Sequence, residues 1–389
     1  PSVVVKSNSI AKTASILADK LDLPADEVAV RLNQPERRFA YIKRLARQEV
    51  VAELEKQKLA GVFFQDTTAR HYPHGSFMCH VLGFVNNDGV GSAGVEQEMD
   101  RYLRGSPGCI ESRVDALRRE LYDERSRYIP PLEGANIVLT IDQNLQYMVE
   151  KALDEVMIEH HAKGAWVIVE RVKTGEILAM SSRPAYDLNE FATADDNRKR
   201  NRSIGVVYEP GSTFKPAVIA AALNEGTVTP ETVFNCENGA WMYKGRSLRD
   251  YHPHGSLTVA DGVKKSSNIL TAKVALTLGE KRMRRYLTAF GIGSKSGIDL
   301  PGEEGGILHP LSEWSGISAS RIAIGQGVSV TALQMVNMIC AIANDGYLMK
   351  PYLVSRVQRG NGTVLLETKP EALSRPISAE TAAVMRKLL

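Results

Sequence analysis

The 389-residue sequence lacks the features that mark several specialised classes of protein. Its four cysteines, Cys79, Cys109, Cys236 and Cys340, form no C-x-x-C pair, so the sequence indicates neither a disulfide framework nor a zinc site. No run approaches the roughly 18 apolar residues of a membrane-spanning helix. The start of the sequence also lacks the charged and apolar regions of a signal peptide. Cysteine usage therefore leaves the redox compartment open, and the sequence shows no membrane segment.

The sequence also has little net charge. Its 48 Lys and Arg residues and 45 Asp and Glu residues give a net charge of +3, whereas a nucleic-acid-binding chain needs a large, clustered basic excess. Hydrophobic residues make up 43% and charged residues 24%, which is typical of ordered globular proteins rather than of disordered ones. At roughly 150 residues per domain, the length predicts two or three domains.

The first part of the sequence predicts an elongated, mixed α/β module without catalytic residues. Apolar residues recur at helical spacing over residues 9–32, with a fresh helix start at Pro24, and again over residues 41–59. Over residues 62–128, short apolar runs separated by glycines predict strands and turns. The Pro/Gly cluster at residues 128–134 predicts a domain boundary, which we place between residues 133 and 134.

Residues 134–389 predict a second domain of the α+β class, in which strands precede helices. A strand is expected at residues 137–141, a long helix at 142–160 and a hairpin at 165–169 and 176–180. Further helices are expected at residues 216–224, 258–278, 280–290, 331–344 and 378–389.

The strongest candidate for chemistry lies where the first of these later helices begins. Ser212 and Lys215 are three residues apart and should face each other on one helical turn. A serine hydroxyl needs an adjacent base to act as a nucleophile at neutral pH. Lysine can be that base only when neutral, and each unit by which its pKa is lowered costs about 1.4 kcal/mol, through burial or nearby cations. A helix N-terminus favours both the neutral amine and a developing oxyanion.

Ser-x-x-Lys alone is a weak motif, because Ser9 and Lys12 match it on what we expect to be a solvated helix face. The second motif is Ser266-Ser267-Asn268. Alone it favours a helix cap or a polar turn. Together with Ser212 and Lys215, the Ser266 hydroxyl could relay a proton, and the Asn268 amide could contact a substrate peptide bond.

These motifs belong to the signature of β-lactamases and penicillin-binding proteins. The sequence resembles the penicillin-binding proteins nearly from end to end, and the resemblance also rests on residues 70–75, 81–84, 94–96, 139–142, 174–180 and 324–335. Residues 1–133 resemble the pedestal of class B, monofunctional members, and nothing resembles a glycosyltransferase domain. Glu209, before Pro210-Gly211-Ser212, is more similar to division-type than to elongation-type members.

The resemblance implies a serine β-lactamase/transpeptidase fold, a sheet flanked by helices, that follows an elongated pedestal. It implies a peptidoglycan D,D-transpeptidase of septal cell-wall synthesis, in which Ser212 attacks the D-Ala-D-Ala bond, Lys215 is the general base, Ser266 relays the proton and Asn268 binds substrate. The Ser212 backbone N–H would form half of the oxyanion hole. No cofactor and no metal are expected.

The resemblance also implies the partners and the location. The expected partners are peptidoglycan stem peptides as D-Ala-D-Ala donor and amine acceptor, β-lactam antibiotics, and, through the pedestal, a membrane glycosyltransferase and other divisome proteins. The expected location is the extracytoplasmic, periplasmic side of the bacterial inner membrane, with a single N-terminal anchor that this chain does not contain.

A third family motif, Lys-Thr/Ser-Gly on a strand that lines the site, is expected beyond Leu389. Lys173-Thr174-Gly175 and Lys295-Ser296-Gly297 match it but read as structural turns. The transpeptidase domain is therefore expected to be incomplete at its C-terminus, and the isolated segment to label poorly with penicillin.

Other interpretations of these residues and of the function remain open. Asp250, His252 and His254 favour a loop over a metal site, and the basic run at residues 198–202 favours a solvated face, although it could contact an anionic polymer. The enzyme could instead be an elongation-type or sporulation-type transpeptidase, or a carboxypeptidase or β-lactamase in which water replaces the acceptor amine. A catalytically silent scaffold or sensor is the alternative from another class.

Overall fold

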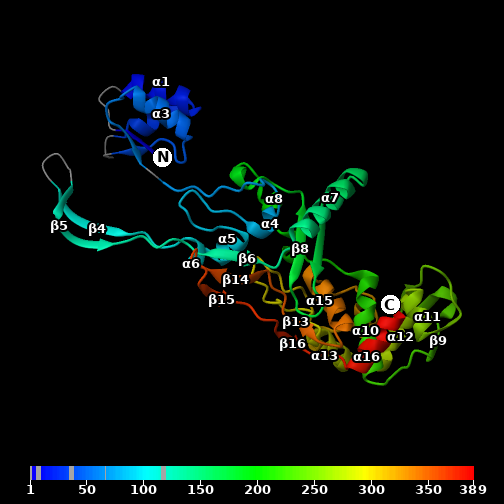
Figure 1. Ribbon diagram of the computed structural model, residues 1–389. Helices are drawn as coiled ribbons and strands as arrows, with labels where there is room; N and C mark the ends of the chain where they lie inside the picture. The colour runs from blue at the N-terminus through cyan, green and yellow to red at the C-terminus, as the bar shows by residue number, and fades with distance from the viewer. Residues whose placement is uncertain (1, 6–9, 35–38, 66, 115–119) are drawn as a thin grey trace. The chain divides into compact units, whose positions relative to one another are not determined.

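The computed structural model describes residues 2–5, 10–34, 39–65, 67–114 and 120–389, which form two compact units (Figure 1). The smaller unit contains residues 1–73 and 85–90, and the larger one contains residues 74–84 and 91–389.

The smaller unit packs three helices against a small antiparallel sheet. The sheet has the order β2-β1-β3, and the elements are β1 (Ser2–Val5), α1 (Ile10–Leu21), α2 (Ala25–Leu32), β2 (Ala40–Tyr41), α3 (Gln48–Lys56) and β3 (Val62–Gln65). Pro24 sits at the N-cap of α2, which confirms the helix start predicted there. Ser9, the serine of the second Ser-x-x-Lys match, lies outside the described residues.

The helix expected over residues 41–59 is correct only over Gln48–Lys56. Tyr41 pairs with Val4 in the sheet, and Leu45 has a φ of 57°, a left-handed conformation that a helix cannot contain. The helical spacing of Ile42 therefore reflects its burial in the core rather than a helix.

The first part of the larger unit contains three helical turns that the sequence prediction missed. They are α4 (Cys79–Leu82), α5 (Gly94–Glu98) and α6 (Asp100–Leu103), each too short to show a helical period, and the antiparallel pair β4 (Cys109–Val114) and β5 (Glu120–Ile129) follows them. Two chain segments cross at Gly83, where a Cβ atom would lie 1.9 Å from the Ala93 carbonyl oxygen. Only glycine permits this crossing.

Two small antiparallel sheets follow, and they confirm the predicted strands. One sheet has the order β15-β14-β6 and the other is the hairpin β7–β8; the strands are β6 (Asn136–Leu139), β7 (Ala165–Glu170), β8 (Ile177–Arg183), β14 (Val354–Gln358) and β15 (Val364–Glu367). Helix α7 (Gln143–Glu159) lies along the hairpin (Figure 1), and the Asp142 carboxylate caps it by accepting from Asn144 N and Leu145 N. Tyr352 joins the sheets, because its carbonyl accepts from Ile177 N at 3.0 Å.

The helical half of the domain is built around α10 (Lys215–Asn224), whose residues Ala217 to Ala222 are all 1% exposed or less. A helix that is apolar on every side must be packed on every side. The helices and short strands around it are α11 (Val259–Lys264), α12 (Asn268–Leu278), α13 (Glu280–Ala289), α14 (Ser318–Ile322), α15 (Ala332–Ala343), α16 (Ala379–Leu388), β9 (Val233–Asn235), β10 (Ala240–Tyr243), β11 (Arg246–Arg249), β12 (Ser256–Thr258), β13 (Leu348–Met349) and β16 (Ala372–Ser374). Four more short turns are α8 (Asp196–Lys199), α9 (Arg202–Gly205), η1 (Leu188–Glu190) and η4 (Leu311–Glu313).

The single helix expected over residues 258–278 is wrong, because the chain breaks between α11 and α12. Ser266 has a φ of 52°, and the Ser267 hydroxyl caps α12 by accepting from Leu270 N at 3.1 Å. Serine and asparagine side chains compete for backbone groups inside a helix and favour caps, so Ser266-Ser267-Asn268 ends one helix and starts the next. Ser266 therefore lies between the two helices, in a left-handed conformation that belongs to neither.

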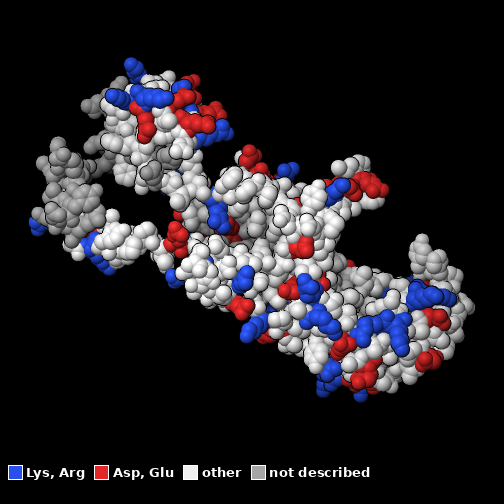
Figure 2. Space-filling view, viewed as in Figure 1, with Lys and Arg blue, Asp and Glu red and all other residues white. Residues whose placement is uncertain are grey.

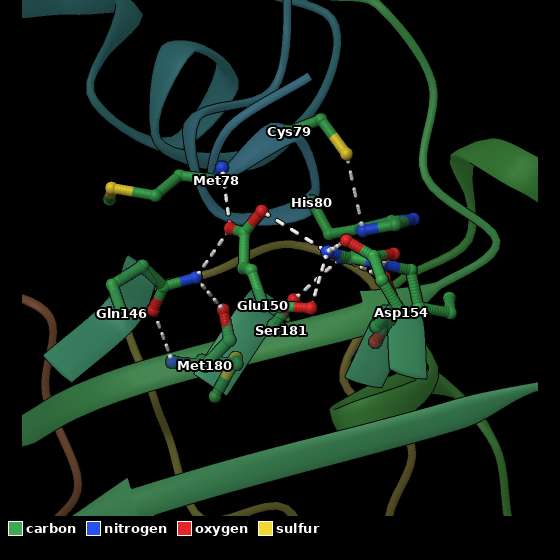
Figure 3. A network of polar contacts seen from close by, with 10 residues as sticks. Met78, Cys79, His80, Gln146, Glu150, Asp154, Met180 and Ser181 are labelled. Carbon is green, nitrogen blue, oxygen red and sulfur yellow. Dashed lines mark hydrogen bonds and ion pairs between the residues drawn. The ribbon is translucent and has the colours of Figure 1, made fainter. Parts of the chain in front are cut away.

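A buried polar network joins residues 74–84 to α7 and β8 within the larger unit (Figure 3). The Arg183 guanidinium donates to Asp154 at 2.5 Å, to Ser181 at 2.9 Å and to Glu150 at 3.3 Å. The Glu150 carboxylate also accepts from Met78 N at 2.9 Å and from Gln146 at 2.8 Å.

His80 adds a further link from the same segment. Its Nε2–H donates to the Arg198 carbonyl at 2.7 Å, and burial lowers the pKa of the imidazole to about 4, so it is neutral. Every charge in this network is therefore either paired or neutralised.

Candidate active site

Ser212 lies on a tight turn, η2 (Gly211–Phe214), that leads into α10. Residues 325–330 hold this turn. Gly211 N donates to the Gly325 carbonyl at 3.1 Å, and Gly327 N donates to the Glu209 carboxylate at 2.8 Å. A Cβ atom on Gly325 would lie 2.2 Å from the Gly211 carbonyl oxygen, so glycine is required for this approach.

Lys215 is buried one turn beyond Ser212, and its amine is held by the second motif. Nζ donates to the Ser266 carbonyl at 2.6 Å and to the Ser266 hydroxyl at 3.0 Å. Burial lowers the pKa of Lys215 to about 8, against the negative charge of Asp250, which raises it. The amine therefore has the pKa of a usable general base.

The structure thus brings Lys215 and Ser266 together, residues that are 51 positions apart in the sequence. Ser212 is exposed at the start of the same helix. Among the hydrogen bonds of the described residues, none joins the Ser212 hydroxyl to the Lys215 amine, and such contacts in free enzymes often tighten only when substrate binds.

Asp250 organises the second motif and was missed by the sequence reasoning, which placed it in a loop with His252. Its carboxylate accepts from the Ser267 hydroxyl at 2.7 Å and from the backbone N–H groups of Asn268 at 2.5 Å and Ile269 at 3.0 Å. A carboxylate is favoured at the N-terminus of a helix such as α12. The sequence indicated only that a helix starts near Ser267. It did not indicate that Asp250 caps this helix, because Asp250 and Ser267 are 17 residues apart.

Asn268 lies at the same helix start. Its side-chain amide donates to the Arg249 carbonyl at 2.8 Å, which ties the motif to strand β11. This bond uses the amide nitrogen and orients the amide group.

Lys173-Thr174-Gly175 lies at a turn, as expected, and Lys295-Ser296-Gly297 lies in a loop without regular secondary structure. Lys173 is in the β7–β8 turn and pairs with Asp345 at 3.0 Å. In the other, the backbone N–H groups of Ser296 and Gly297 donate to the Glu303 carboxylate at 2.7 and 3.1 Å. Each set of contacts is structural.

The basic run at residues 198–202 is not a uniformly solvated face. Arg198 is exposed beside Asp195, but Arg202 is only 9% exposed. The Arg202 guanidinium donates to Asn197 at 2.9 and 3.0 Å. A buried arginine requires such partners, so this part of the expectation is wrong.

Within the described ranges, no helix is both long and apolar enough to cross a membrane. The same residues contain no group of three or more His, Cys, Asp or Glu side chains that could hold a metal ion.

Two protein families match the chain. The family described as penicillin binding protein transpeptidase domain matches residues 164–389, and the one described as penicillin-binding protein dimerisation domain matches residues 1–139.

Relatives agree with these matches. Stage V sporulation protein D of Bacillus subtilis is 35% identical over 345 residues, which are 88% of this chain and 53% of that protein. Peptidoglycan D,D-transpeptidase FtsI of Escherichia coli is 32% identical over 342 residues, 88% of this chain and 57% of that one. The chain therefore spans little more than half the length of these relatives.

Solved structures show the same likeness. Penicillin binding protein 3 from Mycobacterium tuberculosis matches with a TM-score of 0.72 and 30% identity, over 82% of this chain and 68% of that one. Its complex with ampicillin also matches with a TM-score of 0.72.

Proposed function

This chain belongs to the class B penicillin-binding proteins, and from that premise we propose that it carries out the acyl transfer of peptidoglycan cross-linking, with Ser212 as the nucleophile. The proposal rests on the environment of the Lys215 amine. The amine donates hydrogen bonds to Ser266, and burial lowers its pKa to about 8. At pH 7 such an amine is neutral in about a tenth of molecules, against about three in ten thousand for an ordinary lysine.

In the proposed reaction, the Ser212 hydroxyl attacks the carbonyl carbon of the D-Ala-D-Ala bond and its proton passes to Lys215 Nζ. The bond to the terminal D-Ala breaks, that residue leaves with a proton on its amine, and an acyl-enzyme remains on Ser212 Oγ. An amine of a second stem peptide then attacks the ester, which forms the cross-link and restores the serine.

The neighbours of Lys215 have supporting roles in this proposal. The Ser266 hydroxyl, 3.0 Å from Nζ, relays the proton to the leaving amine. Asn268, oriented by its bond to Arg249, contacts the substrate peptide through its amide oxygen. The Ser212 backbone N–H provides one donor of the oxyanion hole at the start of α10.

The wider biological role is part of the same proposal. Residues 1–133 would form the pedestal that binds a membrane glycosyltransferase and other divisome proteins, and residues 134–389 would form the transpeptidase domain. The site would act on the extracytoplasmic side of the inner membrane in septal synthesis, and β-lactams would acylate Ser212. The ampicillin complex of the similar Mycobacterium tuberculosis protein supports β-lactam binding, and the sporulation relative supports a sporulation role as the alternative.

Labelling of the full-length protein with a fluorescent penicillin tests the proposal. The wild type and the Ser9→Ala variant, which removes the serine of the other Ser-x-x-Lys match, should label equally, and Ser212→Ala should not label. Labelling that survives Ser212→Ala would show that the nucleophile is another residue. A label that is lost within seconds by hydrolysis would favour a β-lactamase or a carboxypeptidase instead.

A further inference from the structure

Three exposed cations flank the second motif. Lys264 and Lys265 directly precede Ser266, and Arg249 supplies the carbonyl that binds the Asn268 amide. Among the ion pairs of the described residues, none involves these three side chains. Figure 2 shows lysine and arginine gathered on the surface over the elements that Figure 1 labels α11 and α12. We call Arg249, Lys264 and Lys265 the cationic rim.

The acidic groups closest in sequence to the rim are already engaged. Asp250, next to Arg249, accepts three hydrogen bonds at the start of α12. Asp261, one turn before Lys264 and Lys265, accepts from the Thr258 hydroxyl at 2.8 Å. Among the ion pairs of the described residues, neither carboxylate pairs with a side chain of the rim, so the three cationic groups remain available to a ligand.

The backbone fixes the rim on both sides of the motif. On β11, Leu248 is buried and its neighbours Ser247 and Arg249 share the opposite, exposed face. The Ser247 carbonyl accepts from Arg321 at 3.0 Å, which holds this strand in place. Lys265 is the C-cap of α11, immediately before the left-handed Ser266. Arg249 and Lys265 thus lie at the two ends of the segment that presents Ser266 and Asn268.

We propose that the cationic rim binds a free carboxylate of the stem peptide, away from the reacting bond, and so selects stem peptides whose side carboxylates are not amidated. The inference rests on the proposed function, because it concerns the substrate of the same site. A guanidinium and two ammonium groups attract a carboxylate and do not attract the neutral amide that replaces it. Cations around the second motif also raise the local concentration of an anionic substrate.

The test compares two synthetic stem peptides that differ only in a free or an amidated side carboxylate. The measured quantity is the ratio of their kcat/KM values, first with the pair as donor and a fixed acceptor, and then with the pair as acceptor. The wild type should prefer the free carboxylate by about fivefold in one of the two arms, and the arm in which it does so identifies the stem peptide, donor or acceptor, whose carboxylate is bound.

In the Arg249→Gln/Lys264→Gln/Lys265→Gln variant this ratio should fall to about one. The control Arg359→Gln/Lys369→Gln removes exposed cations from the β14–β15 region and should leave the ratio unchanged. A defect in folding would lower both kcat/KM values together and leave their ratio unaltered. In wild type, the preference should also shrink as NaCl is raised, since exposed charges are screened.

An unchanged ratio in the triple variant, or a wild-type ratio of one in both arms, would overturn the inference. Penicillin labelling of Ser212 in the wild type separates the two proposals. If Ser212 labels and the ratio does not respond to the variant, only the cationic rim is contradicted. If Ser212 does not label, the proposed function itself fails.

Discussion

In the proposed function the chemistry depends on Lys215, because burial lowers its pKa to about 8 and its hydrogen bonds to Ser266 position the amine. In that proposal Ser212 contributes the hydroxyl and Lys215 accepts its proton only when neutral. The rate of acylation is therefore expected to follow the titration of Lys215.

The first prediction concerns pH. The second-order rate constant for penicillin acylation should rise with pH, with a midpoint near 8, and level off above it, since the neutral amine is the active form. Stopped-flow fluorescence between pH 6 and 10 measures it. Lys215→Arg should lose at least about a hundredfold, because arginine stays charged throughout this range. A rate that falls with rising pH would contradict the role of Lys215 as base.

A second prediction concerns Asp250. Its negative charge raises the pKa of Lys215, so Asp250→Asn should move the midpoint of the acylation profile to lower pH. Loss of the carboxylate at the start of α12 should also lower the free energy of unfolding by about 1 kcal/mol. Asp261→Asn, at the start of the neighbouring helix, is the matched control and should leave the midpoint in place. A midpoint that is the same in Asp250→Asn as in wild type would contradict the electrostatic coupling.

At the scale of elements, the contacts that cross the sequence decide the site. The break between α11 and α12 places Ser266 at Lys215, and the 325–330 segment holds the turn of Ser212. The network around Arg183 binds residues 74–84 to α7 and β8 (Figure 3). These are packing arrangements between elements rather than properties of single helices.

The third prediction tests this network. Arg183→Met should lower the free energy of unfolding by about 3–5 kcal/mol, because it leaves the buried Glu150 carboxylate without its cation. Urea unfolding at pH 7 measures the change. The double variant Arg183→Met/Glu150→Gln should recover part of the loss, since the unpaired charge is removed and the amide oxygen can still accept from Met78 N. A double variant less stable than Arg183→Met would contradict the pairing.

The fourth prediction uses the neutral His80. Its pKa is about 4 in the folded chain and about 6.5 when unfolded, so the unfolded state binds the proton first as pH falls. The contribution of His80 is therefore fully present above about pH 6.5 and is lost progressively towards pH 4, by up to about 3 kcal/mol. His80→Gln, whose amide can still donate to Arg198, should lose less stability than wild type between pH 7 and 4. Equal pH dependence in the two proteins would contradict a neutral, buried His80.

At the scale of the whole molecule, local patterns predicted more of the strands and long helices than of the contacts between them. Alternation and turn residues were sufficient for β7 and β8, and the long helix α7 was also predicted, over residues 142–160 against Gln143–Glu159. The serine, lysine and asparagine motifs identified Ser212, Lys215, Ser266 and Asn268 as candidates. The roles assigned to those four residues remain proposals.

Other features could not be read from the sequence. The elements α4, α5 and α6 have only four or five residues each, too few for the helical period to repeat. The three cap bonds of Asp250 depend on chain segments that meet only in the folded structure. The predicted division between residues 133 and 134 is likewise not a local property and remains a prediction.

The proposed function requires that Ser212 becomes covalently acylated. Tandem mass spectrometry of proteolytic peptides from the full-length protein, after reaction with penicillin, measures this. One adduct of the mass of the intact antibiotic is expected, located on Ser212. An adduct on Ser266 or on any other residue, or a protein that remains unmodified at saturating penicillin, would contradict it.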